Sequence, residues 1–342
     1  MTRLWMSGLE AGSLDVFFFV ESAAAISAVQ ARTGSYSLQI PSIDDRAWLT
    51  LGVGYTELFF RLGLYMTGGS GGFDRTFCTL LDSLGTVLLT FQVRQADSVL
   101  LVRRGDHNDA LIASGGVVPT NTWCCIEIRA LIDNAVGVIQ VRIDGVQIIN
   151  FSGDTQFGAN SEIMIVLWGA SYSDGDYVCY GYYDDLAINS IHGIRNNSWL
   201  GLGGIVGLVP TGAGNYTQLT PSAGANWQCV DEVPPDDAGT YVENAIVNQR
   251  DTYEMQNLPA IPPGKVADIA AVQWLCRAYN TETQGGDFPR LLRLNGIDYQ
   301  GDDVGYDRSY DYHPEIIEAS PATMQNWTGD EINSLEAGVV VR

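Results

Sequence analysis

The feature that most constrains the fold of this chain is a repeated alternation of apolar residues along short segments. In residues 57–66 (ELFFRLGLYM) every second side chain is apolar, namely Leu58, Phe60, Leu62, Leu64 and Met66. Residues 122–132 repeat the pattern with Cys124, Ile126, Ile128 and Ala130, and leave Cys125, Glu127 and Arg129 on the other face. Since successive side chains of a strand point to opposite faces, these segments predict strands that bury one face.

Residues 138–149 (VIQVRIDGVQII) predict a β-hairpin. Asp144 and Gly145 stand between two alternating runs and match a two-residue type I′ turn. The buried cross-strand pairs of this register are Ile143 with Val146 and Val141 with Ile148.

The first half of the chain is therefore predicted to be all-β. Many short strands with turn residues between them are typical of a sandwich or jelly roll, in which paired sheets hide the strand edges. Helical periodicity is nearly absent before residue 190, and only residues 73–85 (FDRTFCTLLDSLG) are ambiguous between helix and strand.

The composition changes after Ile188. Residues 200–242 are rich in Gly, Pro, Thr and Asn, with apolar islands that a pure linker would lack. We expect a domain boundary near residue 195, then an extended segment that packs against something else, then a smaller β-rich domain.

Three patterns describe that second domain. In residues 267–280 one face of a long strand carries Ala270, Val272, Trp274, Cys276 and Ala278. Residues 290–301 (RLLRLNGIDYQG) predict a strand pair joined by an Asn-Gly turn. Thr328 followed by Glu331 is a capping box, and it predicts a short terminal helix that stops near Gly338.

The charge of the chain excludes several partners. Forty acidic and eighteen basic residues give a net charge of -22, which disfavours binding to nucleic acid or to anionic membranes. No apolar run approaches the roughly 20 residues of a membrane helix. Glu10 and Asp15 interrupt the apolar N-terminal stretch, and no signal-peptide cleavage pattern follows. We expect a chain made in the cytoplasm and not secreted by the general route.

The six cysteines lack any C-x-x-C spacing. That spacing would be needed for a typical zinc site, and a dense disulfide framework is equally disfavoured. We expect mostly free thiols that act as small buried hydrophobic residues.

Four segments of the first half resemble the concanavalin A-like or laminin-G-like sandwich in order and spacing. They are RTGSYSLQI (32–40), ELFFRLGLYM (57–66), the W-x-x-I-E-I strand with its Asp-Gly hairpin (121–148) and YYDDLAIN (182–189). The resemblance covers roughly residues 1 to 190.

The second half, residues 200–342, is similar to the region that follows such a sandwich in virion structural proteins of tailed bacteriophages. Its markers are Pro-Thr-Gly, Thr-Pro-Ser and Val-Asp-Glu-x-Pro-Pro-Asp. The resemblance implies an all-β protein with a concanavalin A-like sandwich (jelly roll) at residues 1–194 and a β-rich virion-assembly domain at 195–342.

The function implied is that of a non-enzymatic virion protein on the tail or the capsid surface, assembled in the host cytoplasm. Its partners would be further copies of itself and other virion proteins. The alternative is a tail adhesin whose sandwich binds a host glycan or receptor. The cluster Tyr172, Tyr177, Tyr180, Tyr182 and Tyr183 is suited to sugar or protein partners.

Self-association of such an acidic chain requires apolar contacts, cations or arginines to offset repulsion. Seventeen of the eighteen basic residues are arginines, which suit bidentate interface pairs. We expect interface arginines in residues 103–109 (RRGDHND) or 249–254 (QRDTYE), although exposed loops are an equally good interpretation.

The paired carboxylates of Asp184 and Asp185, within YVCYGYYDDLAIN (177–189), raise the question of catalysis or metal binding. Neighbouring strand residues point to opposite faces, so the two side chains are not expected to converge on one ligand. The resemblance implies that they belong to the closing strand of the sandwich and have a structural role.

Enzymatic activity is not expected, and neither catalytic nor cofactor-binding residues are assigned. Retaining glycosidases of this fold place two carboxylates on one strand in an alternating run, which this chain lacks. Ser70, in GGSGG (68–72), matches a nucleophile pattern, but its elbow needs an α/β sheet and a histidine. The histidines His107, His192 and His313 are widely spaced and favour surface positions.

No cofactor is expected, although a structural calcium ion is possible. Residues 171–177 (SYSDGDY) and 301–315 (GDDVGYDRSYDYHPE) concentrate carboxylates in loops, and calcium takes six to eight oxygen ligands. Neither segment has EF-hand spacing, and solvated acidic loops are the alternative.

Overall fold

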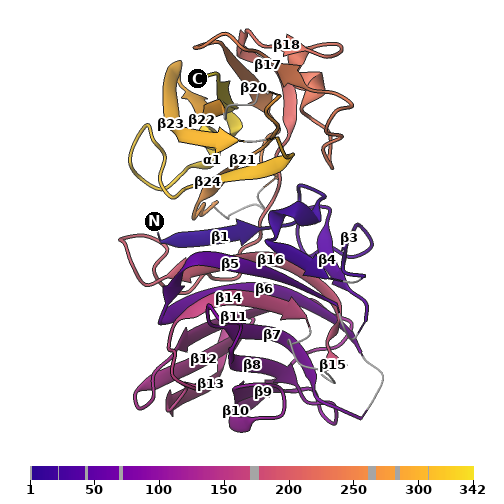
Figure 1. Ribbon diagram of the computed structural model, residues 1–342, viewed down its shortest axis with the longest axis vertical. Coiled ribbons are helices and arrows are strands. Elements are labelled where there is room, and N and C mark those ends of the chain that lie inside the picture. The colour runs from indigo at the N-terminus through magenta and orange to yellow at the C-terminus, as the bar shows by residue number, and fades with distance from the viewer. Residues whose placement is uncertain are drawn as a thin grey trace. The chain divides into compact units, whose positions relative to one another are not determined.

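The structure is a computed structural model that describes residues 2–21, 23–42, 45–68, 72–169, 177–260, 267–281, 286–306 and 308–342. The chain divides into Met1–Val206, here called unit 1, and Gly207–Arg342, here called unit 2 (Figure 1). Nearly all regular structure in both units is strand, which confirms the prediction of an all-β fold.

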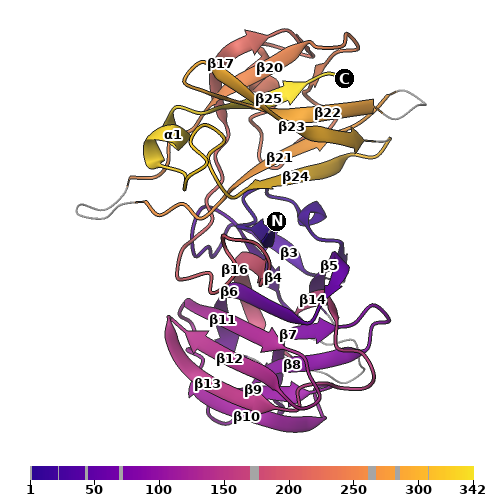
Figure 2. The same cartoon turned by 90° about the vertical axis from the view of Figure 1, so that its left-hand side faces the viewer.

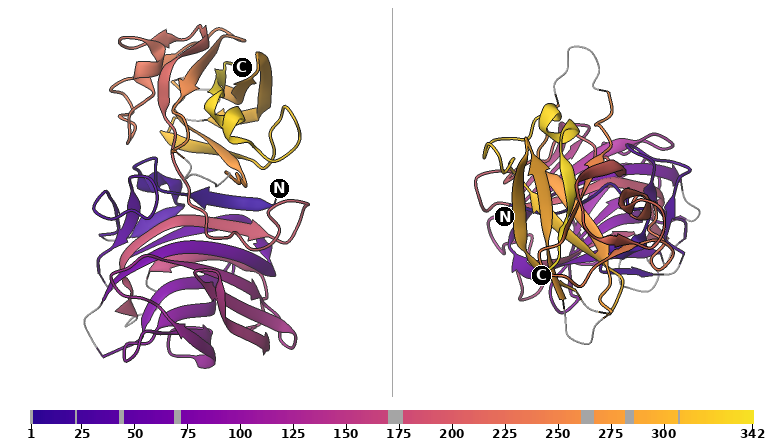
Figure 3. Two further views of the ribbon diagram at one scale, coloured as in Figure 1. Left: turned by 180° about the vertical axis from the view of Figure 1, so that it is seen from behind. Right: turned by 90° about the horizontal axis from the view of Figure 1, so that it is seen from above.

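Unit 1 is a sandwich of two eight-stranded sheets. Sheet A has the order β13-β12-β11-β6-β16-β4-β3, and β1 pairs with β16 in addition. Its strands are β1 (Arg3–Ser7), β3 (Ala25–Ser27), β4 (Ser37–Ile40), β6 (Glu57–Gly68), β11 (Cys124–Leu131), β12 (Gly137–Ile143), β13 (Val146–Gly153) and β16 (Tyr180–Ser190). Seen from behind in Figure 3, the indigo strand β1 lies beside the pink strand β16.

Sheet B has the order β10-β9-β8-β7-β14-β5-β2, with β15 paired to β7. Its strands are β2 (Phe19–Glu21), β5 (Arg46–Tyr55), β7 (Arg75–Leu81), β8 (Val87–Val93), β9 (Val99–Arg104), β10 (Ala110–Val117), β14 (Ile163–Gly169) and β15 (Tyr177–Val178). A single 3-10 turn, Leu14–Val16, precedes β2. The ambiguous segment 73–85 is thus strand β7 and a turn, and all seven residues of β7 are buried. Burial on both faces removes the polar alternation that would have identified the strand.

The core of unit 1 lies between the two sheets and contains the residues that the alternation predicts. The predicted inward residues of β6 and β11 are all buried: Leu58, Phe60, Leu62, Leu64, Met66, Cys124, Ile126, Ile128 and Ala130. Phe60 of sheet A meets Phe91 of sheet B edge to face, with ring centroids 5.9 Å apart. All six cysteines are free, as predicted.

The hairpin of β12 and β13 forms as predicted, with two corrections (Figure 2). Val146 was predicted to be buried but is 66% exposed, because it directly follows the turn at the end of the hairpin. Asp144 and Gly145 both have positive φ, 50° and 80°, as a type I′ turn requires. Ile143 faces Val146, but the partner of Val141 is Ile149 and not Ile148. A register shift between Val141 and Arg142 causes the difference, because the extra residue of a bulge moves the following pairs by one.

The division between the units falls later than the predicted boundary at residues 194/195. Residues 199–205 run along sheet A and are held there by side chains of its strands, as described below. They therefore belong to unit 1, although their composition resembles that of the segment that follows.

Unit 2 contains a five-stranded sheet, sheet C, with the order β17-β20-β25-β22-β23 (Figure 2). Its strands are β17 (Pro210–Thr217), β20 (Arg250–Met255), β22 (Gly286–Leu294), β23 (Ile297–Tyr306) and β25 (Glu336–Val340). Two strand pairs complete the unit: β18 (Thr220–Pro221) with β19 (Val242–Glu243), and β21 (Val272–Ala278) with β24 (Asp311–Ile317). The Asn295-Gly296 turn between β22 and β23 has the predicted positive φ angles, 52° and 79°.

The core of unit 2 gathers around Trp274, Phe288 and Trp327. Within the described part of unit 2, the helical segments are a 3-10 turn, Asn226–Cys229, and one α-helix, α1 (Gly329–Asn333). The predicted capping box forms, since Thr328 Oγ1 accepts from Glu331 N and Glu331 Oε2 accepts from Thr328 N. The helix is shorter than predicted, because Gly338 lies in β25 against Asp251, where a Cβ would come within 1.9 Å of a carbonyl oxygen. None of the helices in the described ranges has the length and hydrophobicity needed to span a membrane.

The register of β12 can be tested by a pair of neighbouring substitutions. Val141 is fully buried, whereas Gln140 lies on the other face and pairs with Asn150. We expect Val141→Asp to destabilise unit 1 by at least about 3 kcal/mol, because it buries an unpaired charge. Gln140→Asp should cost less than about 1 kcal/mol. Urea unfolding of both variants measures the difference, and equal losses would contradict this register.

Candidate functional site

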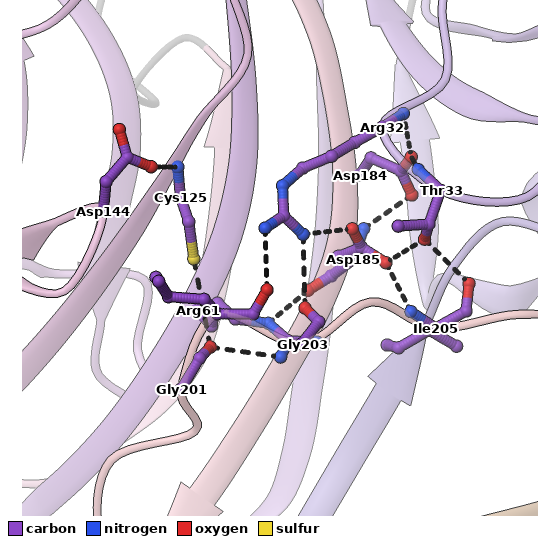
Figure 4. A network of polar contacts seen from close by, with 11 residues as sticks. Arg32, Thr33, Arg61, Cys125, Asp144, Asp184, Asp185, Gly201, Gly203 and Ile205 are labelled. Carbon is purple, nitrogen blue, oxygen red and sulfur yellow. Dashed lines mark hydrogen bonds and ion pairs between the residues drawn. The ribbon is translucent and has the colours of Figure 1, made fainter. Parts of the chain in front are cut away.

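Asp184 and Asp185 lie at a β-bulge in the middle of β16. The pairing of β16 with β6 shifts between Asp184 and Ala187, and Asp185 has a φ of 51°. Tyr183 and Leu186 consequently both face the core. The prediction that the two carboxylates point to opposite faces is therefore wrong, since the bulge turns both toward the loop at Thr33 on the outer face of sheet A (Figure 4).

The Asp184 carboxylate binds three backbone N–H groups. Its Oδ2 accepts from Arg32 N at 2.7 Å and from Thr33 N at 3.2 Å, and its Oδ1 accepts from Asp185 N at 2.6 Å. Both carboxylates are fully buried. Asp184 therefore fixes the loop at Arg32 and Thr33 against β16.

The Asp185 carboxylate binds a cation, a hydroxyl group and a backbone N–H group. Its Oδ2 pairs with the Arg32 guanidinium at 2.5 Å. Its Oδ1 accepts from Thr33 Oγ1 at 2.6 Å and from Ile205 N at 2.5 Å. Asp185 thus joins the same loop to residue 205, at the end of unit 1.

The segment that precedes Ile205 is held by charged side chains of sheet A and of the loop at Arg32. Arg32 donates to the carbonyl oxygens of Leu202, at 2.9 Å, and Gly203, at 3.2 Å. Arg61 of β6 donates to the Gly201 carbonyl at 3.3 Å, and Glu127 of β11 accepts from Gly201 N at 2.7 Å. These contacts satisfy the polar backbone groups of an irregular segment on the face of a sheet.

The same segment begins with an aromatic anchor. The guanidinium of Arg142 lies 3.8 Å from the centroid of the Trp199 ring, and Phe59 meets that ring edge to face at 5.3 Å. Residues 199–205 and the loop at Arg32 therefore cover the outer face of sheet A around Phe59, Arg61 and Asp184. Gly63 leaves room for this cover, because a Cβ there would lie 2.7 Å from Arg32 Cδ.

Burial shapes the protonation of the network. Its members carry two guanidinium groups, Arg32 and Arg61, and three carboxylates, Asp184, Asp185 and Glu127. Burial raises the pKa of Asp184 to about 7, and the Asp185 carboxylate contributes to the increase, while the backbone N–H groups oppose it. Burial also lowers the pKa of Arg61.

This network is suited to holding the chain and not to catalysis. Both aspartate side chains are fully buried, and all four carboxylate oxygens already have partners. A nucleophile or general base has to reach its substrate. The structural role predicted for Asp184 and Asp185 is consistent with this geometry.

The uncovered part of the same outer face carries three aromatic side chains from neighbouring strands, here called the aromatic row. Trp123 precedes β11, Tyr65 lies in β6 and Tyr182 lies in β16. The Tyr65 ring centroid lies 5.5 Å from that of Trp123 and 6.0 Å from that of Tyr182. All three residues are half-buried and lie outside the core clusters.

Polar groups of the aromatic row lack partners within the described residues. The hydroxyl groups of Tyr65 and Tyr182 make no hydrogen bond there. The same holds for the side-chain amide of Gln39, which faces Tyr182 across β4 and β16. Trp123 Nε1 is buried and also has no acceptor among these residues. Because this nitrogen is buried, the polar groups of the row that a ligand can reach are the two hydroxyl groups and the Gln39 amide.

The tyrosines that cluster in the sequence do not cluster in space. Tyr183 is in the core, and Tyr180 packs against it. Tyr177 stacks on Phe73 with ring centroids 4.4 Å apart. Only Tyr182 joins the aromatic row, and Tyr172 lies outside the described residues. Sequence reasoning missed Tyr65, although its position on the polar face of ELFFRLGLYM was a usable signal.

The structure does not bring the other candidate residues together. His107 contacts Asp106 and Asn108, His192 lies beside Tyr55, and His313 meets Phe288. Ser70 and residues 171–176 of the first acidic loop lie outside the described residues. Across the described ranges no group of His, Cys, Asp and Glu has an arrangement that would hold a metal ion.

The arginines expected at subunit contacts have partners within the chain. Arg103 donates to Gln92 and pairs with Asp74, Arg104 pairs with Asp154, and Arg250 pairs with Asp298. These pairs reduce the number of guanidinium groups in the two segments that are available to a partner.

The chain matches no known family model and no curated protein. Its fold resembles several solved structures in part. The cellulose-induced protein Cip1 matches 58% of this chain and 100% of its own, with 16% identity and a TM-score of 0.45. Domain 4 of AbnA, an extracellular arabinanase from Geobacillus stearothermophilus, was solved with arabinotriose. It matches 55% of this chain and 92% of its own, with 16% identity and a TM-score of 0.39.

The carbohydrate-binding module CBM66 from Bacillus subtilis matches 50% of this chain and 94% of its own, with 9% identity and a TM-score of 0.35. At these identities and TM-scores the likeness says nothing about what this chain binds.

The raised pKa of Asp184 predicts the direction in which the stability of unit 1 changes with pH. The pKa is about 7 in the folded chain and about 4 in an unfolded one. The folded state therefore holds this proton more tightly, so the group stabilises folding most below about pH 4 and loses that contribution as the pH rises to about 7. The side chain that Asp184→Asn introduces does not titrate. We expect the stability advantage of the native chain over this variant to shrink between pH 5 and pH 7.5.

Urea unfolding at the two pH values measures this advantage, and the transition that Val141→Asp shifts to lower urea concentration identifies unit 1. Asp97→Asn is the matched control, because Arg94 lowers the pKa of this exposed carboxyl group. Its pH trend should be weak or opposite. A difference that grows with pH for Asp184→Asn would contradict the prediction.

Proposed function

We propose that this chain is a non-enzymatic glycan-binding protein and that the aromatic row of unit 1 is its binding surface. The observation that carries the proposal is the combination of three half-buried aromatic rings with two hydroxyl groups and one amide that lack partners among the described residues. A sugar presents apolar C–H faces and hydroxyl groups together. Binding sites commonly combine aromatic walls with a few polar groups that fix orientation.

The segments that cover the rest of the outer face of sheet A support the same proposal. Residues 199–205 and the loop at Arg32 cover sheet A beside the row, and they stop short of Trp123, Tyr65 and Tyr182. What distinguishes the row is that its three rings adjoin one another, whereas single exposed aromatic residues are common on protein surfaces. Adjoining rings beside polar groups are suited to binding a partner.

The resemblance of residues 200–342 to virion proteins of tailed bacteriophages supports placing this glycan-binding protein on a phage particle. In that setting it acts as a tail adhesin, with unit 2 connecting the sandwich to other virion proteins. Labelling of particles with an antibody against the chain tests this placement, and labelled fibre tips are the expected result. Absence of the chain from purified particles would contradict it.

The binding surface is tested by substitution of the aromatic row. On a glycan array of bacterial surface and plant polysaccharides, we expect the native protein to bind at least one glycan. Trp123→Ala and Tyr182→Ala should each weaken that binding at least about tenfold, as loss of an aromatic anchor commonly does. Tyr182→Phe, which removes only a hydroxyl group, should weaken it about fivefold.

Phe18→Ala is the matched control, because Phe18 is 70% exposed and lies next to β2 of sheet B. It should bind like the native protein, and thermal unfolding shows whether each variant is folded. An array without any bound glycan, or folded row variants that bind normally, would refute the proposal.

A further inference from the structure

The aromatic row continues across sheet A as a line of uncharged residues. Tyr182 faces Gln39 of β4, and Gln39 faces Ala25 of β3. From β11 to β3 the line crosses four gaps between strands, which corresponds to roughly 19 Å at about 4.8 Å per gap. A ligand that follows this line lies across the strands and not along them.

The polar groups beside the line are uncharged as well. Thr67, two residues beyond Tyr65 on the same face of β6, is exposed, and so is Thr122, which precedes Trp123. Thr67 Oγ1 donates to the Tyr180 carbonyl at 3.1 Å, so it offers a ligand only an acceptor. Thr122 and Gln39 offer a hydroxyl and an amide group. Such groups bind sugar hydroxyls without the desolvation cost of a buried charge.

The charges on the covered side of the row are occupied. The Arg32 guanidinium is bound by the Asp185 carboxylate and by the carbonyl oxygens of Leu202 and Gly203. Asp184 is saturated by backbone N–H groups. The cation that an acidic sugar would need is therefore already neutralised, and the net charge of -22 repels anionic polymers.

We infer that the ligand of this surface is an uncharged oligosaccharide that lies across strands β11, β6, β16, β4 and β3, stacks on the aromatic row and hydrogen-bonds to Gln39. The inference rests on the proposed function and adds the charge, direction and length of the glycan. Acidic polysaccharides are excluded as the preferred ligands.

Pairs of polymers that share one backbone and differ in charge test whether the ligand is uncharged. The probes are hydroxyethyl cellulose against carboxymethyl cellulose and dextran against dextran sulfate, together with the array. Affinity electrophoresis should show retardation by a neutral polymer and at least about tenfold weaker retardation by its anionic partner. Raising the salt to roughly 0.5 M should leave neutral binding unchanged, because no ion pair is involved.

The length and direction of the ligand are tested with oligosaccharides of increasing length, prepared from the neutral polymer that binds. Affinity should rise with length and reach a plateau once the extended oligosaccharide spans roughly 19 Å. Gln39→Ala should weaken binding of the plateau oligosaccharide about fivefold and leave the shortest one unchanged. Gln140→Ala, which removes an amide from β12 of the same sheet, is the matched control and should have no effect.

The outcomes separate the two proposals. Tighter, salt-sensitive binding of an anionic polymer through Trp123 would overturn the inference and leave the proposed function in place. The inferred direction across the strands would be wrong if affinity kept rising with oligosaccharide length. It would also be wrong if Gln39→Ala left the affinity unchanged at every length. No binding to any glycan would reject the proposed function and this inference together.

Discussion

The pairing of Arg32 with the buried carboxylates of Asp184 and Asp185 is the interaction on which the outer face of unit 1 depends. Five ionisable groups lie within one network on that face, and removal of Arg32 leaves the buried Asp185 carboxylate without its cation. In buried ion pairs such a loss typically costs about 3 to 5 kcal/mol. The network therefore determines which part of sheet A is covered and which part, the aromatic row, stays open.

Much of the fold could be predicted from local sequence, because one-sided burial leaves a period-two pattern. The inward faces of β6 and β11 and the Asp-Gly turn follow from that pattern. Strand β7 did not, since it is buried on both faces. The bulges at Ile148 and Asp185 also escaped prediction, because a bulge adds one residue without a distinctive composition. The prediction for Asp184 and Asp185 failed for that reason.

The candidate site could be predicted only in part. Tyr182 was among the tyrosines singled out, but its neighbours in the row, Tyr65 and Trp123, come from strands distant in sequence. Their contact depends on the pairing of β11, β6 and β16, which local patterns do not specify. The charged residues Arg61 and Glu127, on the predicted polar faces of their strands, likewise gave no indication that residues 199–205 would cover them.

The anchoring of Ile205 affects how the chain transmits force. Unit 2 begins at Gly207, so a pull on unit 2 reaches unit 1 through the bond from Ile205 N to Asp185 and through the carbonyl contacts of Arg32. These bonds join side chains that are themselves fixed in β16 and in the loop at Arg32. Tension is thereby shared among several bonds before it reaches the strand ladder. A load on the C-terminal end of unit 1 would have to break these bonds before it reached the hydrogen bonds between the strands.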